Sequence, residues 1–331
     1  MPSPIPITRL LPKDFGLEFG ACSSPLTKTT SGSTLRVPVN TFHGKVAHRL
    51  WSSVIHWREL QALEPIGSGG FGTVFKATYF GETVAVKKVR CVKNKLASRQ
   101  SFWAELNAAH LHHQNIVRVI AATTCTPAHL NTKDNIGTIV MEFAGALNLH
   151  QVIYGLAAPL PMDKCVKYSI DIARALQHLH AHATVHLDLK PANVLVSQQG
   201  VCKLADFGCS FKLSSKSDTV VTHLSEIGGT FTHRAPELLK GEEVTTRVDI
   251  YSFGITMWQL LTRELPYEGD RQCILYAVVA YNLRPSFTRD VFIQSSSGKT
   301  CQKLISRCWD SDPNIRPTAD QLVNELSLIL L

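Results

Sequence analysis

The first half of the chain carries short stretches with the period of β-strands. Residues 74–79 alternate between apolar and polar side chains, and a returning stretch, 83–89, follows after Gly81. These two stretches predict a β-hairpin. Two further apolar runs, 116–122 and 137–143, predict additional strands. The pattern therefore favours a β-rich first part of the folded chain.

The second half changes to helical spacing. Apolar residues recur every three or four positions before residue 180, at Val166, Ile170, Ala173, Leu176 and Leu179. Residues 194–196 and 201–204 predict a short hairpin, and 238–331 are mostly amphipathic helix interrupted by prolines. A shorter helix is expected to start at Ser101, after a basic loop at 93–99.

The first 56 residues differ from the rest. Pro, Ser, Thr and Gly are frequent there, with no sustained period of 2 or 3.6, so residues 1–56 are predicted to be mostly disordered. Residues 57–331 are long enough for one large domain. No run of 18 apolar residues occurs, and the longest candidate, 250–261, is interrupted by polar residues. We therefore expect no membrane span.

Composition narrows the cellular setting and the partners. Nine cysteines in 331 residues form no Cys-x-x-Cys pair, which is typical of reduced thiols in a cytoplasmic protein. Cys209 is expected to be a buried thiol rather than an accessible one. The formal net charge is +8, but no basic patch is interleaved with aromatic residues, so direct nucleic-acid binding is not expected. A solvated basic face that docks an acidic partner is the preferred interpretation.

Residues 186–193 contain the parts needed to move a phosphoryl group. Asp188 can accept a proton from an attacking hydroxyl, Lys190 can hold the charge of the group in flight, and Asn193 offers an oxygen to Mg²⁺. A second carboxylate for metal, Asp206, begins an Asp-Phe-Gly turn. The extended string followed by this turn is far more specific than a lone His-x-Asp.

A glycine-rich turn precedes these residues. Residues 67–72 read Gly-Ser-Gly-Gly-Phe-Gly and lie between two predicted strands. The turn differs from a Rossmann turn, in which a helix follows the glycines, and from a Walker loop, which ends in Gly-Lys-Ser/Thr. Lys87 follows on the next strand, where it can pair with phosphate oxygens, and Glu105 on the predicted helix is its expected carboxylate partner.

Together these motifs resemble the eukaryotic protein kinases over about residues 57–331. The resemblance implies an α+β, bilobal kinase fold, with a small β-rich N-lobe at about 57–143 and a larger helical C-lobe at about 144–331. It also implies ATP and Mg²⁺ in the cleft between the lobes. Transfer of the ATP γ-phosphoryl to a protein substrate is the expected reaction.

The resemblance also implies roles for individual residues. Asp188 and Lys190 are the expected catalytic pair, and Asn193 and Asp206 are the expected metal ligands. The expected ATP-binding residues are Gly67, Ser68, Gly69, Gly70, Phe71, Gly72, Val74, Ala85, Lys87, Glu105, Met141, Glu142, Ala144 and Leu195. In this set Glu142 and Ala144 act through their backbone groups, and Met141 guards the pocket behind adenine.

Several more positions match the family. The run 190–193 and the pair Gly229-Thr230 are similar to serine/threonine rather than tyrosine kinases. Asp249 matches a buried carboxylate that supports the catalytic loop, and Arg316 matches the partner of Glu237.

One departure concerns regulation. The family's usual His-Arg-Asp is His-Leu-Asp here, with Leu187 in place of the arginine that binds a phosphate on the activation segment. Leucine has no donor for such a phosphate. We therefore predict that activity does not require phosphorylation of Thr219, Thr222 or Ser225 in that segment.

Four runs, 101–107, 150–155, 229–237 and 274–281, together with 185–193 and the opening Met-Pro-Ser-Pro, resemble a germ-cell branch of the family. This implies a kinase that activates a MAP kinase kinase in oocyte maturation and in arrest at second meiotic metaphase, with Ser3 as a regulatory candidate. Two alternatives stay open. A pseudokinase scaffold would bind ATP without transfer, and a Raf-like or mixed-lineage-like kinase would carry further domain segments that are missing here.

Overall fold

A computed structural model describes residues 51–69, 72–91, 95–125, 127, 134–213 and 230–330 of the chain. The chain divides into two units, 1–48 and 49–331, and every described residue belongs to the second. The predicted regulatory site Ser3 and nearly all of the predicted disordered tail lie outside the described residues. The boundary at residue 56 stays a prediction.

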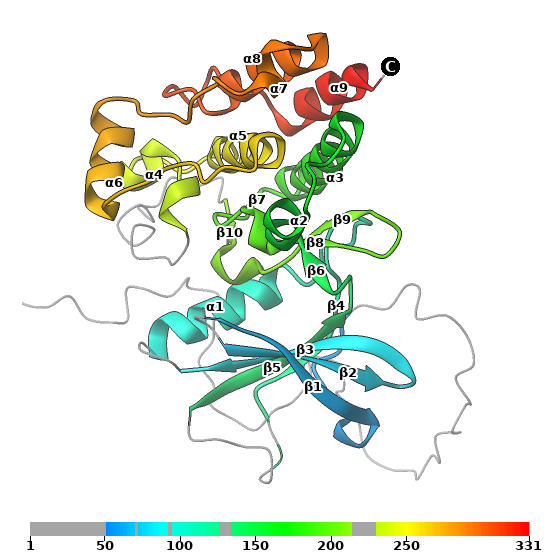
Figure 1. The fold of residues 1–331 in the computed structure, drawn as a ribbon. Helices are drawn as coiled ribbons and strands as arrows, with labels where there is room; N and C mark the ends of the chain where they lie inside the picture. Colours follow the sequence, from blue (N-terminus) through cyan, green and yellow to red (C-terminus); the bar gives the residue numbers. More distant parts are fainter. Residues whose placement is uncertain are drawn as a thin grey trace, which may run out of the picture. The chain divides into compact units, whose positions relative to one another are not determined.

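A five-stranded antiparallel sheet forms the first part of the described unit (Figure 1). Its strands, in the order β1-β2-β3-β5-β4, are β1 (Leu60–Gly69), β2 (Gly72–Tyr79), β3 (Glu82–Arg90), β5 (Asn135–Glu142) and β4 (Val119–Thr123). The predicted β2–β3 hairpin is confirmed. Its turn residues are Phe80 and Gly81, and both have positive φ, at 50° and 81°. That backbone matches the right-handed twist of the two strands.

The strand predicted at 116–122 starts later than expected. Ile116 makes only an isolated bridge, to Leu204 of the C-lobe, before β4 begins at Val119. Within an apolar run, hydrophobicity alone does not distinguish a residue in a strand from a residue buried against another element. Here Ile116 pairs with Leu204 instead of with a strand of the five-stranded sheet.

The basic loop predicted at 93–99 is wrong for residues 95–99. Helix α1 (Lys95–Asn107) already includes them, while 92–94 lie outside the described residues. The buried face of α1 consists of Ser98, Ser101, Phe102, Glu105 and Leu106. Only two of these are apolar, so the helical period is weak in the sequence. Helix α1 is instead stabilised by its contacts with the sheet and with the Asp-Phe-Gly turn.

The second part of the unit is helical, as predicted (Figure 1). Its two longest helices, α3 (Met162–Ala181) and α5 (Arg247–Thr262), lie in one large apolar cluster. The other helices are α2 (Leu149–Gly155), α4 (Pro236–Lys240), α6 (Arg271–Ala280), α7 (Asp290–Ile293), α8 (Ser296–Cys308) and α9 (Ala319–Ile329). No described helix is both long enough and apolar enough to span a membrane.

Two small sheets place the reactive loops between the sheet and the helices. β6 (Leu147–Asn148), β8 (Val194–Val196) and β9 (Cys202–Leu204) form one, and β7 (Thr184–Val185) pairs with β10 (Phe211–Lys212) in the other. The predicted hairpin is β8–β9, which pairs antiparallel. Asn193 comes directly before β8, and Asp206 comes two residues after β9. The hairpin therefore brings the two chain segments together at one end, where the Ala205 N–H donates to the Asn193 carbonyl at 2.9 Å.

Candidate active site

Three donors surround the Asp188 carboxylate. Asn193 Nδ2 donates to its Oδ2 at 2.9 Å, and Lys190 Nζ lies 2.9 Å from the same oxygen. The backbone N–H of Thr230 donates to Oδ1 at 2.9 Å. Lys190 Nζ also donates to Thr230 Oγ1 at 2.6 Å. The sequence-predicted catalytic pair thus lies together, and its carboxylate is held in one orientation.

Asp249 of α5 supports this loop from below, as predicted. Its carboxylate is fully buried and accepts the backbone N–H groups of His186 at 2.9 Å and Leu187 at 3.0 Å. His180 Nε2 lies 3.0 Å from the same carboxylate, a contact that the sequence did not indicate. Burial alone would raise the pKa of Asp249, but the His180 hydrogen bond and these other contacts hold its pKa below the ordinary value.

Two residues beside the reactive groups have left-handed backbone. Leu187 has φ 64° and Asp206 has φ 63°, a region that non-glycine residues seldom adopt. Such residues cost of order 1 kcal/mol or more and persist where the surrounding structure fixes them. The Asp249 hydrogen bonds fix the first. The Leu187 side chain itself is only 5% exposed and lies in the C-lobe apolar cluster.

Lys87 joins three elements in one ionic contact. Its Nζ lies 2.6 Å from Glu105 Oε2 on α1 and 2.6 Å from Asp206 Oδ1. The predicted partner Glu105 is therefore in place, and it also accepts the backbone N–H of Phe207 at 3.3 Å. Burial lowers the pKa of Lys87, but the two carboxylates outweigh burial and raise it above the ordinary value. Lys87 is a fixed cation.

Asn193 and Asp206 present oxygen atoms suited to a hard divalent cation. The side-chain NH₂ of Asn193 donates to the backbone carbonyl and to the carboxylate of Asp188. The side-chain carbonyl oxygen of Asn193 is therefore the atom left for a ligand. The Asp206 side chain is 37% exposed although one oxygen meets Lys87. In the described part of the chain no three His, Cys, Asp or Glu side chains form a metal cluster. Two oxygen ligands completed by phosphates and water fit Mg²⁺.

The glycine-rich turn connects β1 and β2. Gly67, Ser68 and Gly69 end β1, and Gly72 begins β2, while Gly70 and Phe71 lie outside the described residues. Gly72 has φ 145°, and a Cβ there would lie 2.0 Å from the carbonyl oxygen of Lys88. Only glycine allows this approach of β2 to β3.

The residues expected around adenine gather in one apolar cluster. Ala85, Met141 and Ala144 are buried members, and Val74 and Leu195 pack against it from β2 and β8. They come from both lobes, as the kinase resemblance implies.

The side chain of Glu142 is already engaged. It lies 2.9 Å from Lys203 Nζ and accepts the backbone N–H of Arg118 at 2.9 Å. Its backbone N–H donates to the Arg118 carbonyl at 2.9 Å. The side chain and the backbone N–H of Glu142 are thus engaged within the protein, and the expected role of its backbone toward adenine stays a prediction.

A buried polar chain below the site was missed by the sequence reasoning. His233 Nε2 lies 2.6 Å from Gln259 Oε1, and Gln259 Nε2 donates to the Tyr154 hydroxyl at 2.9 Å. Burial lowers the pKa of His233 to about 4, so the ring is neutral. No local pattern links these three residues, because they come from separate elements.

The predicted Glu237–Arg316 pair is confirmed. Both side chains are buried, and Arg316 Nη1 and Nη2 donate to the two Glu237 carboxylate oxygens at 2.5 Å and 2.8 Å.

Burial also decides Cys209. The thiol is 4% exposed, and burial raises its pKa to about 12, so the predicted buried thiol is confirmed.

Comparison with known proteins agrees with this geometry. The model of the protein kinase domain matches residues 60–326. Serine/threonine-protein kinase mos of Xenopus laevis is 48% identical over 98% of this chain and 92% of its own length. Proto-oncogene serine/threonine-protein kinase mos of Sus scrofa is 49% identical over 98% of both chains. Serine/threonine-protein kinase mos of Gallus gallus is 48% identical over 98% of both chains.

The matched domain confirms the predicted bilobal fold, with its β-rich first lobe and helical second lobe. It also confirms the expected ATP-dependent phosphotransferase class, which uses ATP and a divalent metal. The chain belongs to the protein kinase family, and within it to the serine/threonine kinases related to mos.

Proposed function

We propose that this kinase phosphorylates and thereby activates a MAP kinase kinase in the cytoplasm of oocytes, acting in meiotic maturation and in arrest at second metaphase. The observation that carries the proposal is the similarity to mos kinases over 98% of the chain, well beyond the catalytic motifs. Ser3, in the N-terminal segment, is the proposed regulatory phosphosite.

Asp188 is the proposed catalytic base. Its carboxylate is oriented by Asn193, Lys190 and the Thr230 backbone, which leaves one geometry for receiving the proton of a Ser or Thr hydroxyl. Lys190, 2.9 Å from that carboxylate, neutralises charge on the transferring group. Thr230, bonded to both, ties the segment that would hold the substrate peptide to the reactive groups.

Lys87 is the proposed ligand of the α- and β-phosphate oxygens. Glu105 fixes its ammonium from α1, and the glycine-rich turn between β1 and β2 would cover the phosphates. Val74, Ala85 and Leu195 enclose adenine by apolar contact. Because the group in transfer is loosely bonded, positioning and charge neutralisation supply most of the rate enhancement.

Asn193 and Asp206 are the proposed Mg²⁺ ligands. A divalent cation held by these two side chains would supply positive charge that offsets the negative charge of the phosphoryl group in transfer. The protein holds its own part of the site ready through two contacts. Lys87 orients Asp206 by one carboxylate oxygen, and Asp188 fixes the Asn193 amide.

The arrangement of Leu187 supports activity without an activation-segment phosphate. The side chain is buried in the apolar cluster, and the backbone is held by Asp249 rather than by a charged side chain. Thr219, Thr222 and Ser225 lie outside the described residues. The proposal is that phosphorylation there is compatible with activity but does not switch it on.

The first experiment is a transfer assay with ATP, Mg²⁺ and a catalytically inactive MAP kinase kinase, comparing the unmodified protein with Asp188→Asn. Phosphate on Ser or Thr of the substrate that disappears in the variant is the expected result. Autophosphorylation without substrate labelling would overturn the proposed substrate. ATP binding without any transfer would instead favour a scaffold.

A further inference from the structure

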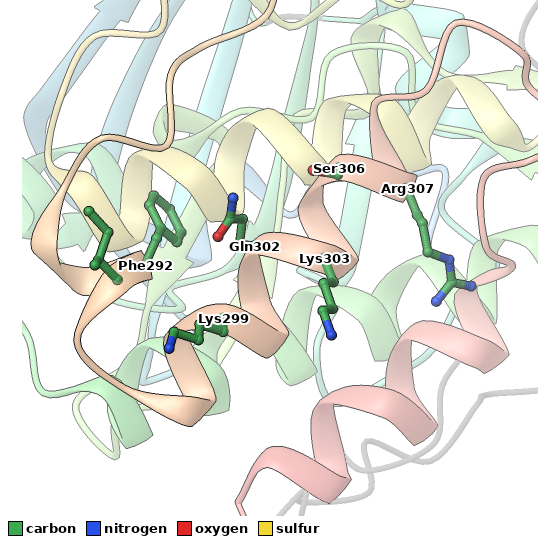
Figure 2. Close-up of a pocket in the computed structure, with 7 residues that line it drawn as sticks. Phe292, Lys299, Gln302, Lys303, Ser306 and Arg307 are labelled. Carbon is green, nitrogen blue, oxygen red and sulfur yellow. The ribbon is translucent and has the colours of Figure 1, made fainter.

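A groove lies on the C-lobe surface between α7 and α8 (Figure 2). It has a volume of about 760 Å³ and is open to solvent. Phe292 and Ile293 of α7 form its apolar side, and Lys299, Gln302, Lys303 and Arg307 of α8 form its polar side. None of these residues belongs to the proposed transfer machinery. In Figure 1 α7 and α8 lie on the side of α5 away from the five-stranded sheet.

Three cations follow one face of α8. Lys299, Lys303 and Arg307 are each four residues apart, and Figure 2 shows the last two side chains leaving the same side of the helix. Successive members are therefore about 6 Å apart along the axis. Arg307 is already neutralised, because its Nη1 donates to both Glu325 oxygens at 3.0 and 2.8 Å.

Lys299 and Lys303 are not neutralised in this way. Both are exposed, and neither has an ion pair with any residue in the described ranges. Like charges four residues apart destabilise a helix. Lys299 also lies near the helix N-terminus, where a cation opposes the helix dipole, and the first turn carries no acidic residue to offset it. These charges weaken α8 locally, and an anionic ligand would remove that cost.

The apolar side of the groove is buried at its base and exposed at its rim. Phe292 is fully buried and packs edge-on against Phe287 at 4.9 Å between ring centroids. Ile293, the next residue, is 55% exposed. A ligand side chain that covers Ile293 would gain apolar contact while its charged groups meet the two lysines.

We propose that this groove, which we call the α7–α8 groove, binds an acidic peptide segment of a partner protein. The segment would carry one apolar side chain followed by carboxylates at alternate positions. In an extended peptide such carboxylates are about 6.6 Å apart, which matches the lysine spacing. Residues 1–50 of this chain do not fit, since they contain six Lys or Arg and only two Asp or Glu.

Nucleic acid fits the groove less well than a peptide. Stacking of bases needs an exposed aromatic face, and the aromatic residue of the groove, Phe292, is buried. The exposed isoleucine beside the two lysines favours an apolar peptide side chain rather than a phosphate backbone. The proposal therefore commits to a protein partner.

The test measures fluorescence anisotropy of a short labelled peptide in which one Leu is followed by Glu at alternate positions, with the full chain. A matched peptide with Gln in place of Glu is the first control. We expect saturable binding of the Glu peptide that weakens as salt rises, and binding of the Gln peptide at least about tenfold weaker. Equal binding of the two peptides, or none of either, would overturn the proposal.

Lys299→Glu combined with Lys303→Glu tests the location. We expect the affinity to fall about tenfold or more, because two exposed attractions become repulsions. Lys164→Glu combined with Lys167→Glu is the matched control, since these two lysines are also exposed on a helix, α3, but line no part of the groove. The control should change the affinity less than about twofold. An equal loss in both double variants would mean that only net charge matters, which contradicts the proposal.

Two further variants separate folding from binding. Lys299→Gln with Lys303→Gln removes charge without reversal, and Ile293→Ser removes the apolar rim. Both should melt within a few degrees of the unmodified protein and should phosphorylate a short peptide without acidic residues at the unmodified rate. Their affinity for the Glu peptide should nevertheless be lower than that of the unmodified protein. Vesicles of anionic lipid and single-stranded DNA serve as competitors. If the vesicles or the DNA displace the peptide at equal charge concentration, the groove binds that ligand and the peptide proposal is wrong.

Discussion

The backbone N–H of Leu187 donates to Oδ1 of Asp249 at 3.0 Å, across 62 residues of sequence. This contact holds a leucine in the left-handed backbone region, with φ 64°, directly before the proposed base. The carboxylate that receives the hydrogen bond is fully buried in α5. The geometry of the catalytic loop therefore depends on one side chain from the helical core rather than on the charge of the residue at position 187.

Asp249→Asn is expected to lower both stability and activity. The amide keeps one acceptor oxygen, but its NH₂ group replaces the other and faces the N–H group of either His186 or Leu187. Leaving a buried donor unsatisfied costs about 1–3 kcal/mol of unfolding free energy, which denaturant titration can measure. Displacement of Asp188 should also lower kcat, by up to about a hundredfold. The exposed Asp163→Asn on α3 is the control, and equal behaviour of the two variants would refute the assigned role.

Lys87→Arg is expected to leave the fold intact and to abolish most transfer. The planar guanidinium cannot place one point charge between Glu105 and Asp206, each 2.6 Å from Nζ. The loss should be about a hundredfold or more, the usual effect of removing one preorganised charge contact. Lys88→Arg is the matched control, because it changes the next residue of β3, on the opposite face of the strand. Retained transfer in purified Lys87→Arg, measured with ATP and protein substrate, would contradict the assignment.

A buried and an exposed Arg–Glu pair of the C-lobe should differ sharply in energy. Glu237→Gln leaves the Arg316 guanidinium buried without a countercharge, and such a change costs about 3–5 kcal/mol. Glu325→Gln breaks the exposed pair with Arg307 and should cost less than about 1 kcal/mol. Chemical denaturation of both variants compares the costs directly. A cost for Glu237→Gln no larger than for Glu325→Gln would show that burial does not decide the contribution.

Stability should fall as the pH drops through the range set by His233. Its pKa is lowered from 6.5 to about 4 in the folded protein, mainly by burial. Between these values the unfolded chain binds a proton that the folded chain does not, so the unfolding free energy decreases with falling pH. The slope from this residue is at most about 1.4 kcal/mol per pH unit, and the contribution is fully present above pH 6.5. The difference between the unmodified protein and His233→Gln isolates it, and parallel stability curves from pH 4 to 7 would argue against a neutral, buried ring.

Combined Ala substitution of Thr219, Thr222 and Ser225 should leave the transfer rate within about twofold. The physical reason is that the Leu187 side chain has no donor for a phosphate and is buried among apolar residues. The measurement uses protein purified from a host without other eukaryotic kinases, with phosphate content checked by mass spectrometry. A rate that collapses in the triple variant, and returns with a Glu at one of the three positions, would restore phosphate dependence.

The sequence by itself determined the family, the change from a β-rich first part to a helical second part, and the residue types of the site. Local patterns suffice for these features because the reactive groups from Asp188 to Asn193 lie within one short loop and Asp206 follows one hairpin later. The β2–β3 and β8–β9 hairpins were also predictable, since each joins neighbouring stretches of chain. Gly72 shows how a single residue type records a close backbone approach.

Only the tertiary structure decided which distant groups meet. The start of α1 at Lys95 was hidden because its buried face is partly polar, with Ser98 and Glu105 among the buried residues. The His180–Asp249 contact and the His233–Gln259–Tyr154 chain join elements far apart in sequence. Hydrogen bonds of this kind follow from the packing of helices around a shared core, and spacing along the chain carries no record of them.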